Sequence, residues 1–227
     1  MIVDVIIPAY NEQDAIVSVL KDIPCNLVRE IIVADNNSTD RTADFARENG
    51  ATVVRAKIQG YGAACLCGLD YISKKNNPPE VVVFLDADYS DHPNELSQIL
   101  EPFNNSSIDL VIGNRVKEKR EIGSMMPQQL IGNKIAVGMI LFLFQYRYKD
   151  LGPFRAIRYN ALQKLQMKDQ TYGWTVEMQV KALNHKLGIQ QIPVSYRKRK
   201  GVSKISGTIK GTFLAGVKII NTIVKYR

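Results

Sequence analysis

Asp86 and Asp88 are separated by one residue and directly follow the apolar run of residues 81–85. An unbroken run of β-forming residues predicts a buried strand in the middle of a sheet. Residues that follow such a strand lie at the carboxyl edge, where open α/β sheets bind ligands. Carboxylates suit hard cations such as Mg²⁺ or Mn²⁺, and Mg²⁺ commonly uses one or two of them together with substrate phosphates. The pair therefore predicts a metal site for a nucleotide diphosphate, although Asp is also common in plain turns.

Three other turns carry residues suited to a nucleotide. Pro8, Tyr10 and Glu12 follow the first predicted strand, Asp35 follows the second, and Gly62 opens a predicted helix. Tyr10 can stack on a base or ribose, and Glu12 and Asp35 can accept hydrogen bonds. Glycine allows close backbone approach, and the N–H groups at a helix start can face an anion. Because neighbouring parallel strands end at one edge, these turns should lie beside the two aspartates.

Strand-like and helix-like segments alternate, which is typical of an α/β domain with a largely parallel sheet. Strands are predicted over residues 2–7, 30–34, 52–55, 81–85, 108–113, 154–157 and 189–196. Helices are predicted over residues 12–21, 38–49, 60–73, 93–103, 129–144, 160–165, 175–187 and 207–226. The 227 residues show no repeat, so we expect one domain, with a nucleotide half over residues 1–115 and an acceptor half over residues 116–227.

Charge is distributed unevenly. Residues 178–227 contain no Asp or Glu and carry a net charge of +11, which leaves −3 for the first 177 residues of a chain of net charge +8. Such asymmetry favours a polyanionic ligand or surface near the C-terminal end. A solvated basic face is the plainer interpretation.

Two segments are candidates for membrane contact. Residues 135–144 are apolar throughout, but ten residues are too few for a span, which needs about 20, so a buried or interfacial helix is predicted. The final helix is amphipathic, and its lysines follow one edge of the apolar stripe Ile209, Phe213, Val217, Ile220 and Val224. This pattern suits an anionic membrane surface and suits docking on the protein's own core equally well.

The cysteine and histidine content argues against two classes of site. Three cysteines without framework spacing argue against a disulfide scaffold, and two histidines argue against a His/Cys zinc site. The sequence begins directly with a strand-like segment and shows no basic region of a signal peptide. A reduced, cytoplasmic setting is therefore expected.

Four further motifs complete the pattern: Gly113-Asn114-Arg115, residues 150–155, residues 172–177 and the basic run of residues 197–204. In this order, the motifs resemble the inverting family 2 glycosyltransferases of the GT-A fold, over nearly the whole chain. The resemblance is closest to the dolichyl- or polyprenyl-phosphate mannosyl- and glucosyltransferases. It implies a mostly parallel central sheet flanked by helices.

The resemblance also implies roles for individual residues. The nucleotide would be contacted by Pro8, Tyr10, Glu12 and Asp35, with Gly62 in the turn beside it. Mg²⁺ or Mn²⁺ and the diphosphate would be held by Asp86 and Asp88, with Ser90 at the position that completes the metal shell. Phosphate groups of donor or acceptor would be bound by Arg115, Arg199 and Lys204.

The chain departs from this family pattern at three places. Asn36 stands where many relatives have a second Asp, and Gln128 and Gln129 stand in a segment where relatives often carry Arg. Many lipid-phosphate enzymes also continue into C-terminal transmembrane helices, and no such helix is predicted after the basic run of this sequence. A lipid acceptor would then require peripheral attachment through the C-terminal helix or a membrane-protein partner.

The implied reaction is metal-dependent transfer of a hexose, with inversion, from a UDP-glucose or GDP-mannose type of donor to a polyprenyl or dolichyl phosphate. A phosphate acceptor is largely ionised at neutral pH, with a second pKa near about 6, and needs little general base. A hydroxyl acceptor on a cell-surface polysaccharide would need a carboxylate base. Asp150 is favoured for that role over Glu177, because it adjoins a Gly-Pro loop.

Two other classes remain as alternatives. A sugar nucleotidyltransferase also pairs a nucleotide fold with acids, but its Gly-rich loop would follow the first strand, where this chain has residues 8–12. A non-enzymatic module for membranes or nucleic acid would explain the basic tail, yet no nucleic-acid motif supports it. A Rossmann dehydrogenase is disfavoured, because no Gly-x-Gly-x-x-Gly follows the first strand.

Overall fold

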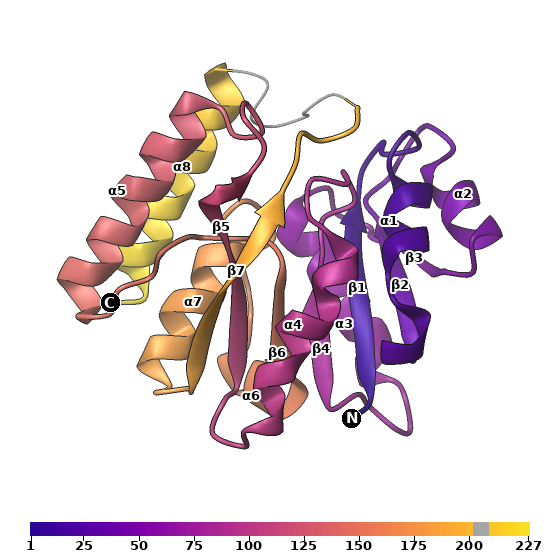
Figure 1. The fold of residues 1–227 in the computed structure, drawn as a ribbon, viewed down its shortest axis with the longest axis horizontal. Helices are drawn as coiled ribbons and strands as arrows, with labels where there is room; N and C mark the ends of the chain where they lie inside the picture. The colour runs from indigo at the N-terminus through magenta and orange to yellow at the C-terminus, as the bar shows by residue number, and fades with distance from the viewer. Residues whose placement is uncertain (202–208) are drawn as a thin grey trace.

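The protein is built on one seven-stranded sheet with the order β3-β2-β1-β4-β6-β5-β7 (Figure 1). The structure, a computed structural model, describes residues 1–201 and 209–227. The strands are β1 (Val3–Ala9), β2 (Glu30–Asp35), β3 (Thr52–Arg55), β4 (Val81–Phe84), β5 (Leu110–Arg120), β6 (Arg155–Arg158) and β7 (Ile189–Tyr196). Within this sheet β6 runs against its neighbours β4 and β5, and the other strand pairs are parallel. The predicted α/β class with a mostly parallel sheet is confirmed.

Helices cover both faces of the sheet. They are α1 (Ile16–Asp22), α2 (Thr42–Glu48), α3 (Tyr61–Ser73), α4 (Leu96–Leu100), α5 (Pro127–Phe144), α6 (Tyr159–Leu165), α7 (Trp174–Asn184) and α8 (Ile209–Lys225). Short 3₁₀ turns are η1 (Cys25–Leu27), η2 (Pro93–Glu95) and η3 (Glu101–Asn104). One apolar layer joins the sheet to α1, α2 and α4, and a second joins it to α3, α5, α6, α7 and α8. In Figure 1, α5 and α8 lie side by side on one flank.

Several predicted element boundaries were wrong for local reasons. The predicted helix over residues 93–103 consists of η2, α4 and η3. Pro102 has no N–H to donate, so the α-helical part ends at Leu100. The predicted strand over residues 108–113 extends to Arg120, because β5 continues to pair with β7. The apolar segment that was expected to be too short for a span belongs to α5, an 18-residue helix that by length and composition could cross a membrane.

The strand order creates a crevice at the carboxyl ends of β1 and β4. The chain moves outward from β1 to β2 and β3, then returns to place β4 on the other side of β1. Open α/β sheets bind ligands at such a reversal of strand order. The turns after β1 and β4, with the residues singled out in the sequence, therefore meet where a ligand site is expected.

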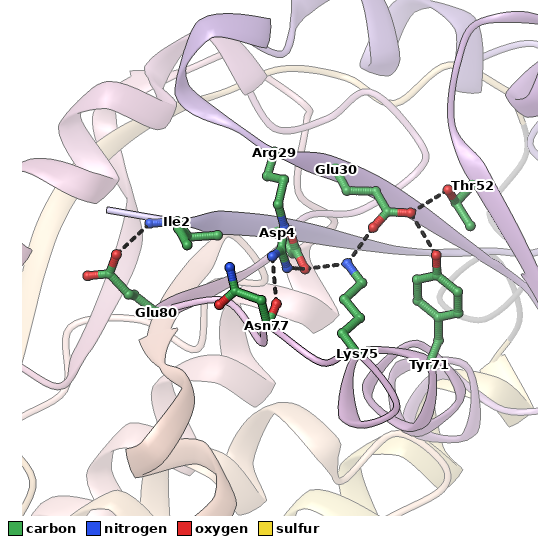
Figure 2. A network of polar contacts seen from close by, with 9 residues as sticks. All are labelled: Ile2, Asp4, Arg29, Glu30, Thr52, Tyr71, Lys75, Asn77 and Glu80. Atoms are coloured by element: carbon green, nitrogen blue, oxygen red, sulfur yellow. Dashed lines mark hydrogen bonds and ion pairs between the residues drawn. The ribbon is translucent and has the colours of Figure 1, made fainter.

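A network of paired charges lies at the opposite, amino end of the sheet (Figure 2). Asp4 at the start of β1 is fully buried and accepts hydrogen bonds from Arg29 Nε at 2.9 Å and Lys75 Nζ at 2.6 Å. Lys75 also pairs with Glu30, which accepts a hydrogen bond from the Tyr71 hydroxyl at 2.9 Å. A buried charge is tolerated when it is paired and hydrogen-bonded. These contacts therefore hold the amino ends of β1 and β2 together.

Candidate active site

A cavity of about 420 Å³ occupies the crevice at the carboxyl ends of β1 and β4. Its wall includes Pro8 at the end of β1, Tyr10 and Glu12 after that strand, and Asp86 and Asp88 after β4. The remaining wall residues include Asn36, Gly60, Tyr61, Thr171, Tyr172 and Arg199. This volume lies in the range of small-molecule sites. The structure thus brings together six of the residues predicted from sequence.

Acidic groups dominate the floor of the cavity. Asp86 accepts a hydrogen bond from the Tyr61 hydroxyl at 3.0 Å, and burial together with the charge of Asp88 raises the pKa of Asp86 to about 7. Asp91 lies behind them and is 1% exposed. Among the described residues, neither carboxylate oxygen of Asp91 has a hydrogen-bond partner. Burial and the charges of Asp86 and Asp88 raise the pKa of Asp91 well above its ordinary value.

Arg199 is the cation shared by two acids of the wall. Its guanidinium donates to Glu12 Oε1 at 2.6 Å and lies 3.2 Å from Asp88 Oδ2. Glu12 is 187 residues away in the sequence, so β7 and the segment after it bring the basic run to the front of the cavity. Arg199, a predicted phosphate-binding residue, therefore lies in the cavity wall between these two acids.

The two cavity carboxylates fit a divalent cation that completes its shell with substrate oxygens. No group of three His, Cys, Asp or Glu side chains among residues 1–201 and 209–227 forms a complete cation cage. Asp86 and Asp88 both reach the cavity, and Mg²⁺ commonly takes one or two carboxylates with substrate phosphates. Ser90 is buried outside the cavity wall, and its hydroxyl donates to Asp88 Oδ1 at 2.5 Å. Ser90 thus orients Asp88, and its role as a metal ligand stays a prediction.

Gly62 shapes the cavity from behind. Its N–H donates to the Thr171 carbonyl at 3.3 Å, and the N–H of Ala63 donates to the Gln170 carbonyl at 2.9 Å. A Cβ on Gly62 would stand 2.0 Å from the Asp169 carbonyl oxygen, so only glycine fits there. The expectation that these N–H groups face an anion is therefore corrected, because the loop of residues 169–171 uses them.

At the end of β2, the first residue after the strand, Asn36, lines the cavity, whereas the last strand residue, Asp35, does not. Asp35 is buried, accepts a hydrogen bond from the Ser38 N–H at 3.1 Å and is not part of the cavity wall. Asn36 is in the wall, where its Oδ1 accepts from the Gly60 N–H at 2.7 Å and its Nδ2 donates to the Ile58 carbonyl at 2.9 Å. Asn36 therefore ties the turn after β2 to the loop before α3, a positioning role that the sequence left open.

Arg115 and Asp150 form a bidentate ion pair outside the cavity wall. Arg115 Nε lies 2.7 Å from Asp150 Oδ2, and Nη2 lies 2.8 Å from Oδ1. Although burial opposes it, Arg115 holds the pKa of Asp150 below its ordinary value. A carboxylate saturated in this way is a weak base, so the geometry does not favour the predicted base role of Asp150. Its visible effect is to position Arg115, whose contact with an acceptor stays a prediction.

The other candidate base is structural in its surroundings. Glu177 is fully buried, pairs with Lys181 at 2.6 Å and accepts hydrogen bonds from the Tyr226 hydroxyl and the Asp169 N–H. Lys204 lies outside the described residues.

Sequence reasoning missed several parts of the site. Tyr172 lines the cavity and belongs to the motif of residues 172–177, but no individual role was predicted for it. Tyr61 and Thr171 also line the cavity, and Asp91 lies behind its acids. A signal existed for Asp91, which stands three residues after Asp88 in an Asp-x-Asp-x-x-Asp series. No local pattern marks Thr171 as part of a wall built around β1 and β4.

The fold and the acid-lined cavity at the strand reversal define a GT-A-type α/β enzyme. The same fold is found in glucosyl-3-phosphoglycerate synthase from Mycobacterium tuberculosis, in complex with Mn²⁺, uridine-diphosphate-glucose and phosphoglyceric acid. That similarity has a TM-score of 0.78 at 22% sequence identity, over 99% of this chain and 79% of that one.

Residues 4–172 match the model of glycosyl transferase family 2, and the chain belongs to this family. It is a glycosyltransferase that uses a nucleotide-sugar donor, which confirms the predicted family and enzyme class. A dolichyl-phosphate hexose transferase of Haloferax volcanii is 30% identical over 97% of this chain and 92% of its own length. The polyprenol monophosphomannose synthase of Mycolicibacterium smegmatis is 29% identical over 90% of this chain and 81% of its own length.

Proposed function

We propose that this glycosyltransferase transfers a hexose, with inversion, from a nucleotide diphosphosugar to a polyprenyl phosphate at an anionic membrane surface. The names of two relatives, a dolichyl-phosphate hexose transferase and a polyprenol monophosphomannose synthase, support the acceptor class. The proposal places the protein on the cytoplasmic face of a membrane, attached from one side.

The observation that carries the proposal is the exposed apolar surface of α5 and α8. Only Ala136 and Ile140 of α5 are buried. The exposed large apolar side chains of the two helices are Leu130, Ile131, Ile135, Leu141, Phe142, Leu214, Val217, Ile220 and Val224. Exposed apolar surface on this scale marks an interaction site. Residues 122–149 and 178–227 contain no Asp or Glu, so both helices complement an anionic bilayer.

The chemistry of the cavity favours a phosphate over a hydroxyl as acceptor. A hydroxyl needs a base, and the two candidates, Asp150 and Glu177, both lie in buried ion pairs outside the cavity wall. The acids in the wall are Glu12, Asp86 and Asp88, of which Glu12 is paired with Arg199 and the two aspartates suit a metal. A phosphate acceptor arrives already ionised at neutral pH and needs no base.

Different residues of the cavity would bind the nucleotide, the metal and the phosphate. Tyr10 and Asn36 shape the wall near the expected nucleotide, and Asp86 and Asp88 would hold Mg²⁺ or Mn²⁺. The metal would supply positive charge to the leaving diphosphate. Arg199 would exchange its pairing with Asp88 for a phosphate, and its guanidinium is suited to that bidentate contact. Holding donor and acceptor in line supplies the rest of the acceleration.

The test compares two lipids that differ in one group. The purified chain is incubated with Mn²⁺ and UDP-glucose, UDP-N-acetylglucosamine or GDP-mannose, in vesicles that carry either a polyprenyl phosphate or the matching polyprenol. Glycosylated lipid should form from the phosphate alone, with one of the donors, and EDTA should abolish it. Equal transfer to the polyprenol, or transfer only to a soluble phosphorylated or hydroxyl acceptor, would overturn the proposed acceptor.

A pair of substitutions tests the membrane surface separately. Phe142→Asp places a charge on the exposed face of α5, and Ile58→Asp places one at an exposed apolar residue of the loop before α3. Cosedimentation with anionic vesicles should fall at least about tenfold for Phe142→Asp and stay unchanged for Ile58→Asp, since burying a charge in the acyl boundary is costly. Equal binding of both variants would remove α5 from the contact.

A further inference from the structure

A second cavity lies outside the donor site, between α8 and the loop that precedes α7. It has a volume of about 400 Å³ and is walled by the loop of residues 168–171 and by the last turns of α8. Thr171 belongs to the walls of both cavities. The second cavity is therefore separated from the donor site by a single loop.

Positive charge is in excess in this second cavity. Its wall contains Lys168, Lys218 and Lys225 and one acid, Asp169. Lys218 Nζ lies 2.8 Å from Asp169 Oδ2, whereas no ion pair occurs for Lys168 or Lys225 within the described part of the chain. Lys168 comes from the loop, and the other two lysines come from α8. An anion held by all three would bridge the loop to the helix.

Asp169 connects this cavity to the donor site. Its Oδ1 accepts hydrogen bonds from the N–H groups of Thr171 at 2.7 Å and Gly173 at 3.1 Å, while Oδ2 holds Lys218. The next carbonyls, of Gln170 and Thr171, accept from the first turn of α3. Thr171 and the following residue, Tyr172, line the donor cavity. The conformation of one short loop is thus shared between Lys218 and the donor wall.

We propose that the second cavity binds a phosphate group between Lys168, Lys218 and Lys225, and that this anion orders the loop of residues 168–172 and tightens donor binding. Binding that orders a segment lowers the entropic cost of a second ligand that needs the same segment. The phosphate could belong to a free anion or to the headgroup of an anionic lipid, because α8 carries both the lysines and the exposed apolar residues. The lipid source rests on the proposed function, and the anion site itself does not.

The first experiment measures the thermal stability of the full chain against inorganic phosphate at constant ionic strength. A ligand at 100 times its Kd stabilises by about 2.7 kcal/mol, a shift that is readily measured. The double variant Lys168→Gln/Lys225→Gln should lose most of the shift. The matched control Lys164→Gln removes an exposed lysine of α6 that lines neither cavity and should respond like the wild type. An equal shift in the double variant would place the phosphate elsewhere and overturn the proposal.

The second experiment measures the coupling. The Kd of UDP and of GDP, each with Mn²⁺, is determined with and without saturating phosphate. The nucleotide that binds should bind at least about fivefold more tightly with phosphate in the wild type and in Lys164→Gln, and equally with and without it in the double variant. Coupling that is unchanged in the double variant would overturn the link through Asp169.

Vesicles distinguish the two sources of phosphate. Phosphatidylcholine vesicles with and without phosphatidic acid are compared by cosedimentation. If the double variant binds phosphatidic-acid vesicles more weakly than the wild type, the phosphate belongs to a lipid headgroup. If phosphate shifts the thermal stability but vesicle binding does not depend on Lys168 and Lys225, the phosphate is a free anion. If the protein glycosylates polyprenyl phosphate but the lysine substitutions change neither phosphate nor nucleotide binding, only the anion site is overturned. If phosphate binding depends on the lysines but no polyprenyl phosphate is glycosylated, only the proposed acceptor is overturned.

Discussion

The two ends of the sheet differ in how far their buried carboxylates are paired with cations of the chain. At the amino end, Asp4 is fully buried and every oxygen of its carboxylate is matched by Arg29 or Lys75 (Figure 2). At the carboxyl end, Asp86, Asp88 and Asp91 share one strand end and the turn after it. Within the described residues, the ion pair at these acids joins Asp88 to Arg199, which is shared with Glu12. The first arrangement is satisfied within the chain, and the second is not.

This difference separates a structural use of charge from a functional one. A paired, hydrogen-bonded acid such as Asp4 holds neighbouring elements together, and its neighbour Glu30 has a lowered pKa because Lys75, Thr52 and Tyr71 outweigh the effect of burial. A buried acid with raised pKa, such as Asp86, costs stability in the free protein at neutral pH. Natural proteins accept such costs at functional sites, where a ligand supplies the missing charge.

The largest expected effect is on catalysis at the carboxyl end. Asp88→Asn removes a charge from the cavity but keeps the side-chain volume, so turnover should fall by at least about 10² to 10³-fold while the fold is kept. Initial rates with the productive donor and Mn²⁺, together with circular dichroism, measure both effects. Asp4→Asn is the matched control at the other end and should keep turnover. Undiminished turnover in Asp88→Asn would break the assignment of function to this end.

The second effect is on stability at the amino end. Asp4→Asn leaves Arg29 and Lys75 without their shared carboxylate, and loss of one partner of a buried pair is strongly destabilising. Because the side chains of Arg29 and Lys75 are partly exposed, we expect about 2–3 kcal/mol, less than for a fully buried pair. For a domain of this size that is a fall in Tm of roughly 5–10 °C. A Tm within one degree of the wild type would show that the network contributes little.

The third prediction concerns pH and metal. The folded-state pKa of Asp86 is raised to about 7. The proton that it keeps therefore stabilises the fold fully below its unfolded pKa of about 4, and that stabilisation is lost as pH rises toward 7. In EDTA, wild-type stability should fall between pH 5 and 7, by up to about 1.4 kcal/mol per pH unit relative to Asp86→Asn. Mn²⁺ binds the ionised form, so its stabilising effect should grow over the same range.

Chemical denaturation at several pH values, with and without Mn²⁺, measures these terms. The comparison with Asp86→Asn removes contributions from acids elsewhere, such as Asp150 and Asp169, whose pKa values are lowered and which act at lower pH. Parallel pH profiles for the two proteins in EDTA would contradict the raised pKa. A Mn²⁺ effect that is equal in both proteins would remove Asp86 from the metal site.

The sequence predicted those parts of the site that follow from local pattern. An apolar run followed by Asp86 and Asp88 is sufficient to place two acids at a strand end, and alternation of strands and helices predicts the parallel sheet. Long-range contacts have no local signal. Arg199 meets Glu12 across 187 residues, and Gly62 contacts a loop more than a hundred residues away, so its role in packing could not be told from a role in anion binding.

The same limit applies to pairing. Asp150 and Glu177 read as candidate bases because their residue type and neighbours allow it, but whether a carboxylate is free or saturated depends on which cation the fold brings to it. Here the fold brings Arg115 to one and Lys181 to the other. The ion pairs of Asp4 could not be predicted from the sequence, because its partners Arg29 and Lys75 are distant in the chain and only the fold brings them to it.

Asp91 provides the smallest and sharpest test of the contrast between the two ends. It is as buried as Asp4, but neither oxygen of its carboxylate has a hydrogen-bond partner in the described residues. Its raised pKa means that the stabilisation by its protonated form is lost as pH rises. Asp91→Asn removes the titrating group at nearly constant volume, so we expect it to raise stability at pH 7.5 in EDTA. The gain should vanish toward pH 4, where the carboxyl is protonated in both states. The identical substitution at Asp4 should have the opposite sign at pH 7.5, and a loss of stability at both positions would mean that the carboxyl end is satisfied like the amino end.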